Sequence, residues 1–291
     1  MFQTLTQVAL PIAIILIMTG VGLSLTPADF TRVLKQPKAF FVGVICQMLI
    51  LPLIAIAVIA LTGLTGELAI GLFILSLCPG GATSNLYSYL AKADVGLSVS
   101  LTAVIGFITP FTIPVLALWA ISFYGSEGDQ FDLPIITTWI KLMIVTVIPV
   151  LIGMAVRGKW ADMAKRSERF VSIFSMAVLA FVIASICVNL GEKLIDFALA
   201  AGPAAIILNL TTMALGYFSG KFLLHQESQS RAITIEVGMQ NGTLALLITS
   251  GILESSSMSI APSIYSLFMF ISASLFTYVV LKRDKALSAQ S

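Results

Sequence analysis

Three polar side chains stand where an apolar stretch would otherwise be continuous. Residues 232–252 read AITIEVGMQNGTLALLITSGI, and Glu236, Gln240 and Asn241 interrupt the run. An ionised glutamate near the centre of a membrane-spanning helix costs about 2.5–3.5 kcal/mol on insertion. The other apolar runs hold no basic residue at that depth, since Lys141 is expected near the outer end of its run. A bound cation is therefore the expected compensation for Glu236, with a protonated structural carboxyl as the alternative.

A second polar stretch supplies oxygen atoms that could surround such a cation. In the segment CPGGATSNLYSYLAKADVGLSVSLT, residues 78–102, Ser98 and Thr102 lie four residues apart and share one helix face. Oxygen ligands are available from carbonyls that the helix breaks would free and from the side chains of Gln47, Ser84, Asn85, Ser98, Thr102 and Gln240. Oxygen donors without thiolate or imidazole suit Na⁺ and disfavour a transition metal. For Ser98 and Thr102 the alternative is back-bonding to a helix carbonyl or packing between helices.

Both stretches also carry residues that interrupt helices. Pro79 has no N–H, and Gly80 and Gly81 resist helical order. Gly238 and Gly242 flank Met239, Gln240 and Asn241. Unpartnered peptide groups in lipid cost several kcal/mol each and are tolerated where they line a cavity enclosed by protein. We predict a discontinuous helix at each place, although Gly and Pro are also common in uninterrupted membrane helices.

The composition places these elements in a membrane. Of the 291 residues 58% are hydrophobic and 10% charged, which is too few charged residues to cover a water-facing surface. The three cysteines lie in apolar runs and are interpreted as small hydrophobic residues. The net charge of +2 suggests no nucleic-acid partner. We predict one all-α unit over 1–291 with about nine spans, at 5–25, 38–61, 68–91, 95–121, 134–156, 170–190, 201–223, 232–253 and 260–281.

The basic residues predict the orientation of these spans. Most of the 16 Lys and Arg residues fall in the odd-numbered connections and after the last span, and positive charge accumulates on the cytoplasmic side. The opposite connections carry the acidic residues Glu67, Glu127, Asp129, Asp132, Glu192, Asp196 and Glu254. The expected N-terminus is outside and the C-terminus cytoplasmic, in a membrane that we take as the bacterial inner (plasma) membrane.

The order of the interrupted spans points to transport. Each is the third helix of a four-helix group, spans one to four and spans six to nine, and the single span between the groups inverts their topology. Inverted repeats with corresponding interrupted helices indicate a midplane site for substrate and ions in secondary transporters.

The motifs CPGGATSN, YLAKADVGLSVSLT and IEVGMQN resemble the two crossover-helix motifs of the bile acid:sodium symporter family. The resemblance covers most of the chain. It implies two crossing discontinuous helices in a core domain, approximately 38–121 and 201–282. It also implies a panel domain, approximately 1–30 and 134–192, formed by the first, fifth and sixth spans. The implied activity is Na⁺-driven import of an organic anion, such as a bile acid or a smaller carboxylate, by alternating access.

The resemblance also implies two Na⁺ sites. The first would lie between Ser84, Asn85, Ser98, Thr102 and Glu236. The second would be formed by Gln47, Glu236 and Gln240 with the backbone oxygens of Val237 and Met239, where Gln47 is matched through the shorter motif QMLILP. Substrate would approach Ala82, Thr83 and Asn241. Met269 and Phe270 either face that cavity and favour an apolar ligand portion, or form a lipid-facing stripe.

The sequence contains no motif that indicates an enzymatic reaction. The sole histidine, His225, is expected at the cytoplasmic interface, and neither a zinc-protease motif nor a hydrolase triad can be assembled, so an enzyme is not expected. Three functions remain open. They are a Na⁺-coupled symporter, a proton-coupled exchanger that titrates Glu236, and a membrane receptor or structural module without transport. The expected partners are a small organic anion and the lipid bilayer, with no obligate protein partner inferred.

Overall fold

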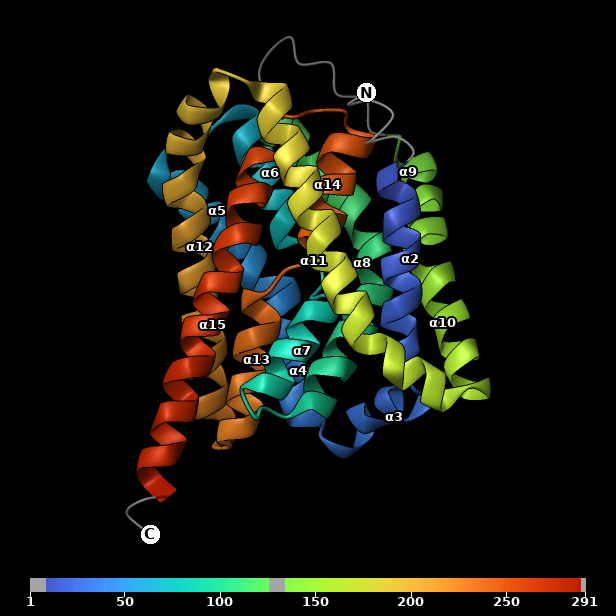
Figure 1. Cartoon of the computed structure of the whole chain (residues 1–291). Helices are drawn as coiled ribbons and strands as arrows, with labels where there is room; N and C mark the ends of the chain where they lie inside the picture. The colour runs from blue at the N-terminus through green and yellow to red at the C-terminus, as the bar shows by residue number, and fades with distance from the viewer. Residues whose placement is uncertain (1–8, 126–133, 289–291) are drawn as a thin grey trace.

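The computed structural model describes residues 9–125 and 134–288, and within these ranges every regular element is a helix. The acidic residues Glu127, Asp129 and Asp132 and the first residues of the predicted span 5–25 lie outside the described residues. α2 begins at one end of the molecule and α15 ends at the opposite end (Figure 1). The helices are α2 (Leu10–Ser24), α3 (Pro27–Lys35), α4 (Pro37–Ile45), α5 (Leu51–Thr62), α6 (Gly66–Ser76), α7 (Ala82–Leu90), α8 (Val95–Tyr124), α9 (Ile135–Leu142), α10 (Ile148–Lys159), α11 (Ala161–Leu190), α12 (Lys193–Leu224), α13 (Glu227–Gly238), α14 (Gly242–Leu246) and α15 (Ile260–Ser288).

Six helices in the described ranges are long and apolar enough to cross a membrane. They are Pro37–Thr62, Val95–Tyr124, Ile135–Lys159, Phe170–Leu190, Lys193–Leu224 and Ile260–Ser288. Three shorter apolar helices, Leu10–Ser24, Gly66–Ser76 and Gly242–Ile252, stand where the sequence predicts the remaining spans. Large apolar side chains such as Phe41, Leu53 and Leu275 are exposed on the outer faces, as expected for a chain surrounded by lipid.

Two of the long helices change their winding just before a proline. A π-helical turn at Cys46–Ile50 joins α4 to α5 and precedes Pro52, and another at Met143–Val147 joins α9 to α10 and precedes Pro149. Proline cannot donate to the preceding turn, so a wider turn relieves the clash and keeps the helix continuous. As a result Gln47, inside the first π turn, points into the protein and is buried.

Several boundaries differ from the sequence prediction. Residues 27–35, predicted as part of a short connection, form the helix α3, in which the Asp29 side chain accepts from the Thr26 backbone N–H at 2.7 Å. α11 begins at Ala161 instead of 170, and α12 begins at Lys193 instead of 201. In α11 and α12 charged residues extend an apolar helix beyond the predicted span, and hydropathy alone does not detect that extension.

Glycines allow the closest approaches between helices. A Cβ at Gly216 or Gly220 of α12 would collide with the backbone of α13 at Thr234 or Ser230. Likewise Gly22 of α2 faces the backbone of α10 at Val150. Helices in lipid associate through such packing and hydrogen bonds because lipid removes most of the hydrophobic driving force. The pairs α12–α13 and α2–α10 are therefore tightly held units.

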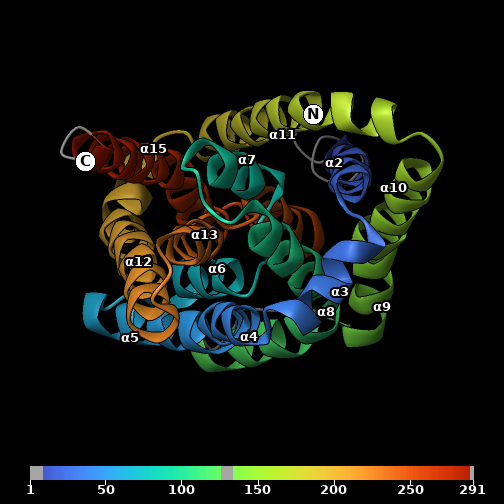
Figure 2. The same cartoon turned by 90° about the horizontal axis from the view of Figure 1, so that it is seen from below.

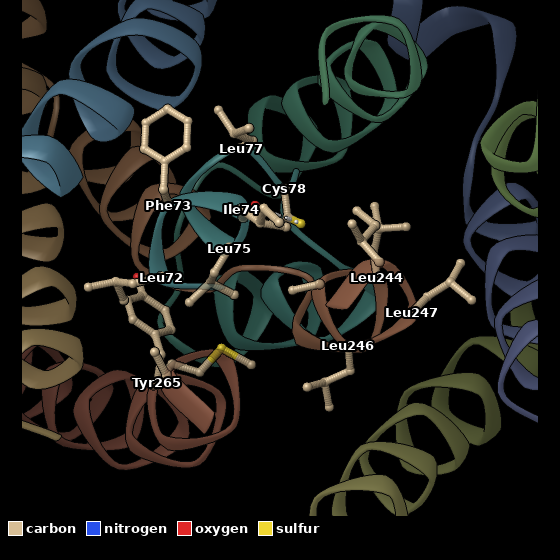
Figure 3. Packing of buried hydrophobic residues seen from close by; sticks show 14 of the residues in the cluster. Leu72, Phe73, Ile74, Leu75, Leu77, Cys78, Leu244, Leu246, Leu247 and Tyr265 are labelled. Atoms are coloured by element: carbon tan, nitrogen blue, oxygen red, sulfur yellow. Dashed lines mark hydrogen bonds between the residues drawn. The ribbon is translucent and has the colours of Figure 1, made fainter. Parts of the chain in front are cut away.

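The interrupted helices occupy the interior. α6 and α13 lie inside a ring of longer helices (Figure 2). α6 and α14 share one half of the molecule's height, and α7 and α13 share the other (Figure 1). Buried apolar side chains from Leu72 to Cys78 and from Leu244 to Leu247 belong to one cluster (Figure 3). This cluster fixes the two interruptions at the same depth.

Candidate functional site

The first interruption separates α6 from α7 at residues 77–81. α6 ends at Ser76 and α7 begins at Ala82, with Pro79, Gly80 and Gly81 in the extended connection. A Cβ at Gly80 would overlap the carboxylate of Glu236. Only glycine, which has no Cβ, lets the backbone come this close to the Glu236 side chain. The predicted discontinuity is present, and its local cause is the Pro-Gly-Gly sequence.

The second interruption separates α13 from α14 at residues 239–241. α13 ends at Gly238, Met239 is extended at φ −110° and ψ 93°, and α14 begins at Gly242. The Asn241 side chain caps the new helix, since its Oδ1 accepts from the Leu244 N–H at 3.0 Å. The residues that break this helix are thus the polar ones that the sequence singled out.

The two interruptions bond directly to each other. The Asn241 N–H donates to the Pro79 carbonyl at 2.8 Å, and Gly80 pairs with Gln240 in an isolated antiparallel bridge. Gln47 joins both, because its Nε2 donates to the Cys78 carbonyl at 2.9 Å and to Gln240 Oε1 at 2.7 Å. Backbone groups that the breaks release thereby find partners inside the protein, as a membrane environment requires.

Glu236 lies fully buried beside this junction, within hydrogen-bond distance of three hydroxyl groups. Its Oε2 is 3.0 Å from Ser84 Oγ and 2.9 Å from Ser98 Oγ, and its Oε1 is 2.6 Å from Thr102 Oγ1. Asn85 Oδ1 approaches the same two α8 hydroxyls, at 3.0 Å from Ser98 and 3.4 Å from Thr102. The structure thus brings together all five residues predicted for the first Na⁺ site.

The charge on Glu236 has no basic partner among the described residues. The nearest arginine on the same helix, Arg231, is engaged elsewhere: it binds Asp284 at 2.6 Å and Glu227 at 3.3 Å. Arg231 also donates to the Ala91 carbonyl at the end of α7, at 3.1 Å. Hydroxyl and amide oxygens with one carboxylate form a donor set that suits an alkali cation.

The second predicted group adjoins the first. Gln240 Nε2 donates to the Val237 carbonyl at 2.6 Å, and Met239 is buried next to it. Gln47 Oε1 is buried and has no hydrogen-bond partner within the described residues. A buried amide oxygen without a partner costs about 1–3 kcal/mol, so a cation at this place would satisfy it. The donor set fits the predicted second Na⁺.

The predicted substrate residues surround a small space. Ala82, Thr83, Asn241, Met269 and Phe270 line a cavity of about 10 Å³, which holds no more than one water molecule. A larger cavity of about 330 Å³ lies on another side of Asn241. Its polar end is formed by Pro79, Gly80, Thr102 and Asn241, and its remaining wall is mostly apolar, from Met18, Val21, Phe107, Val147, Val150 and Leu244 among others.

Sequence reasoning missed the walls of this larger cavity. They come from α2, α3, α8, α10 and α14 and from the π turn before α10, which also contributes Thr146. The only local signal was a threonine three residues before Pro149. A further cavity of about 610 Å³ lies nearer α3 and includes Thr26, Asp29, Asn85 and Arg157. The Arg157 side chain donates to the Leu23 carbonyl at 2.7 Å.

Comparison with known proteins shows that the sequence is similar to those of one family. The sequence model of the Sodium Bile acid symporter family matches residues 11–197, more than half of the chain. An uncharacterized sodium-dependent transporter of Bacillus subtilis, YocS, is 28% identical over 279 residues, which is 95% of this chain and 84% of that protein. The mouse ileal sodium/bile acid cotransporter is 27% identical over 280 residues, 94% of this chain and 78% of the relative.

The match to a plant relative is shorter. The rice chloroplast protein named probable sodium/metabolite cotransporter BASS2 is 31% identical over 240 residues, which is 80% of this chain. The chain spans about half of that relative, since the match covers 54% of it. The matched relatives are named as transporters, which confirms the expectation that the chain is not an enzyme.

Proposed function

The chain belongs to the sodium bile acid symporter family, and we propose that it is a secondary transporter that couples Na⁺ to the import of an organic acid anion. The observation that carries this proposal is the fully buried Glu236, which has hydroxyl partners but no basic partner among the described residues. Binding of Na⁺ would supply the missing positive charge and would also tie α7, α8 and α13 together.

Two ions are proposed, with Glu236 between them. The first occupies the group of Ser84, Asn85, Ser98, Thr102 and Glu236. The second occupies Gln47, Gln240 and the backbone oxygens of Val237 and Met239, with Glu236 shared. An ion at the first site would order Glu236 and the two interruptions, and this ordering would raise the affinity of the second site. Linkage then requires that, if Na⁺ raises the affinity for substrate, substrate raises the affinity for Na⁺.

The substrate is proposed to be an amphipathic anion. The cavity of about 330 Å³ supports this choice, because a polar end at the junction adjoins a mostly apolar wall. The side chain of Asn241 lines this cavity and offers a polar contact for a carboxylate, whereas Thr83, in the first turn of α7, lines the adjoining cavity of about 10 Å³. Amphipathic carboxylates combine the two kinds of surface, whereas a small hydrophilic acid would leave the apolar wall without a partner.

The architecture that this function needs is also proposed. Nine spans, arranged as two inverted four-helix groups with a single span between them and divided into core and panel domains, account for the six long helices and the three shorter ones. The tight α2–α10 packing supports a panel that moves as one body. The distribution of Lys and Arg supports an outside N-terminus and a cytoplasmic C-terminus, and the bacterial inner membrane is the proposed location.

Sodium-dependent uptake tests this function directly. In proteoliposomes we expect uptake of cholate or a smaller carboxylate to depend on an inward Na⁺ gradient and to cease when choline replaces Na⁺. Glu236→Gln should lower this uptake by more than about 100-fold, because losing one partner of a buried charge pair costs about 3–5 kcal/mol and each 1.4 kcal/mol is tenfold. Glu192→Gln, in the loop before α12, is the matched control and should transport normally. Uptake that continues unchanged in choline would overturn Na⁺ coupling.

A proton-coupled exchanger is the second candidate, because a single buried carboxyl is also suited to carrying a proton. In that case the pH gradient would drive uptake and Na⁺ would be dispensable. The cluster of Ser84, Ser98 and Thr102 hydroxyls around Glu236 favours Na⁺, since a proton carrier has no need of so many oxygen ligands. Uptake driven by a pH gradient in the absence of Na⁺ would decide for the exchanger.

A further inference from the structure

The carbonyl group of Gly238 is held by two side chains that the sequence analysis did not single out. Gly238 is the last residue of α13, so no later residue of its own helix satisfies this oxygen. It accepts from Asn209 Nδ2 at 2.9 Å and from the Tyr265 hydroxyl at 3.1 Å. Asn209 belongs to α12 and Tyr265 to α15, and both side chains are completely buried.

Helix packing explains why Asn209 is level with the end of α13. Gly220 and Gly216 let α12 lie against the α13 backbone at Ser230 and Thr234. About one turn closer to the N-terminus of α12, Met213 contacts Gly238, and one more turn in the same direction brings Asn209 to the Gly238 carbonyl. The two helices run in opposite directions, so a polar residue at 209 meets the terminus of α13 at the interruption.

The two donors fix the orientation of one peptide group. A carbonyl oxygen has two lone pairs, and both are used here. The N–H of the same peptide, on Met239, donates to the Ile235 carbonyl at 2.8 Å. Because the Gly238–Met239 peptide is bonded at both ends, the carbonyls of Val237 and Met239 on either side of it have a set direction.

We propose that Asn209 and Tyr265 are positioning residues for the second Na⁺ site, acting through the Gly238 carbonyl. They hold this oxygen toward α12 and α15, so that it does not serve the ion and the neighbouring Val237 and Met239 carbonyls can. This inference rests on the proposed function. It predicts that removing a donor weakens Na⁺ binding although neither side chain touches the ion.

Sodium titration of Tyr265→Phe tests the inference. The purified protein in detergent is titrated with NaCl at constant ionic strength with choline chloride, and thermal stabilisation is the readout. Loss of one hydrogen bond should raise the half-saturating Na⁺ concentration about fivefold. Asn209→Ala should act in the same direction and serves as a second variant if Tyr265→Phe folds poorly. Tyr87→Phe is the matched control, since its hydroxyl contacts Ser274 at 2.9 Å, away from Gly238.

The outcomes separate this inference from the proposed function. A merely structural role would lower the melting temperature without Na⁺ and leave the half-saturating concentration unchanged, and that result in both variants would overturn the inference alone. If the unmodified protein is not stabilised by Na⁺ at all, the proposed function fails and this inference fails with it. A relaxed preference for Na⁺ over Li⁺ in Tyr265→Phe would further support misplaced carbonyls, because ion size is then matched less well.

Discussion

The two helices are interrupted at the same depth, but the causes of the interruptions differ. The first is broken by its own backbone, since Pro79 lacks a donor and Gly80 and Gly81 weaken the helix. The second contains no proline and is shaped by side chains: Asn241 caps α14, Gln240 binds the Val237 carbonyl, and Asn209 and Tyr265 bind Gly238. A local sequence can therefore break one helix, whereas the other depends on its neighbours.

The two interruptions also contribute different chemical groups to the place where they meet. The second contributes the carboxylate Glu236, and the helices at and after the first contribute its hydroxyl partners, Ser84, Ser98 and Thr102. Gln47, from outside both, links them. An ion at this place would couple segments that are distant in sequence, which is the physical requirement for ion binding to control a conformational change.

The largest difference between the breaks should appear when a methyl group is added to each. Gly80→Ala places a Cβ against the Glu236 carboxylate and should remove Na⁺-dependent stabilisation, with a loss of about 2–3 kcal/mol of stability from overpacking. At Gly238 the three atoms nearest to an added Cβ all belong to the flexible Met213 side chain, which can move, so Na⁺ dependence should persist in Gly238→Ala. Thermal melts with and without NaCl measure both. Equal losses in the two variants would contradict the distinction drawn here.

A smaller effect is expected from one hydroxyl at the shared carboxylate. Thr102→Val removes the donor 2.6 Å from Glu236 at nearly constant volume, and should raise the half-saturating Na⁺ concentration about tenfold, since a hydrogen bond to a charged group contributes about 1.5–3 kcal/mol. Thr109→Val is the matched control on the same helix, because the buried Thr109 hydroxyl has no partner in the described part of the chain. It should bind Na⁺ like the unmodified protein. A Thr102→Val titration that overlays this control would remove Thr102 from the site.

The smallest effect is expected at the first residues of the helix that follows each interruption, α7 after the first and α14 after the second. α14 has a side-chain cap in Asn241, whereas α7 starts after Gly81 without one. Asn241→Ala should lower the free energy of unfolding by about 1 kcal/mol, and Asn241→Ser should retain most of it because serine also caps helices. Thermal unfolding without substrate isolates this effect from any role in binding. An Asn241→Ala protein as stable as the unmodified one would show that the cap contributes nothing.

Much of the site was predictable because its chemistry is unusual for a membrane interior. A carboxylate in an apolar stretch, a Pro-Gly-Gly sequence and a Ser-x-x-x-Thr pair are each visible within a few residues. Asn209 and Tyr265 were not predictable in this way, because a single amide and a single phenol on long helices look the same whether they face lipid, a cavity or a peptide group. The cavity walls from α2 and α10 were missed for the same reason, since apolar residues there do not distinguish a cavity from lipid.

The sequence by itself determined the membrane environment, the positions of the two interruptions and the lone acidic group, because each follows from residue chemistry over a short segment. Only the tertiary structure decided which groups meet. Glu236 finds its partners 134 to 152 residues away, and Gln47 reaches Gln240 across 193 residues. These contacts depend on close helix packing at glycines such as Gly80 and Gly216, and on which helix face turns inward. In a chain that is apolar on nearly every face, hydrophobic periodicity does not carry that information.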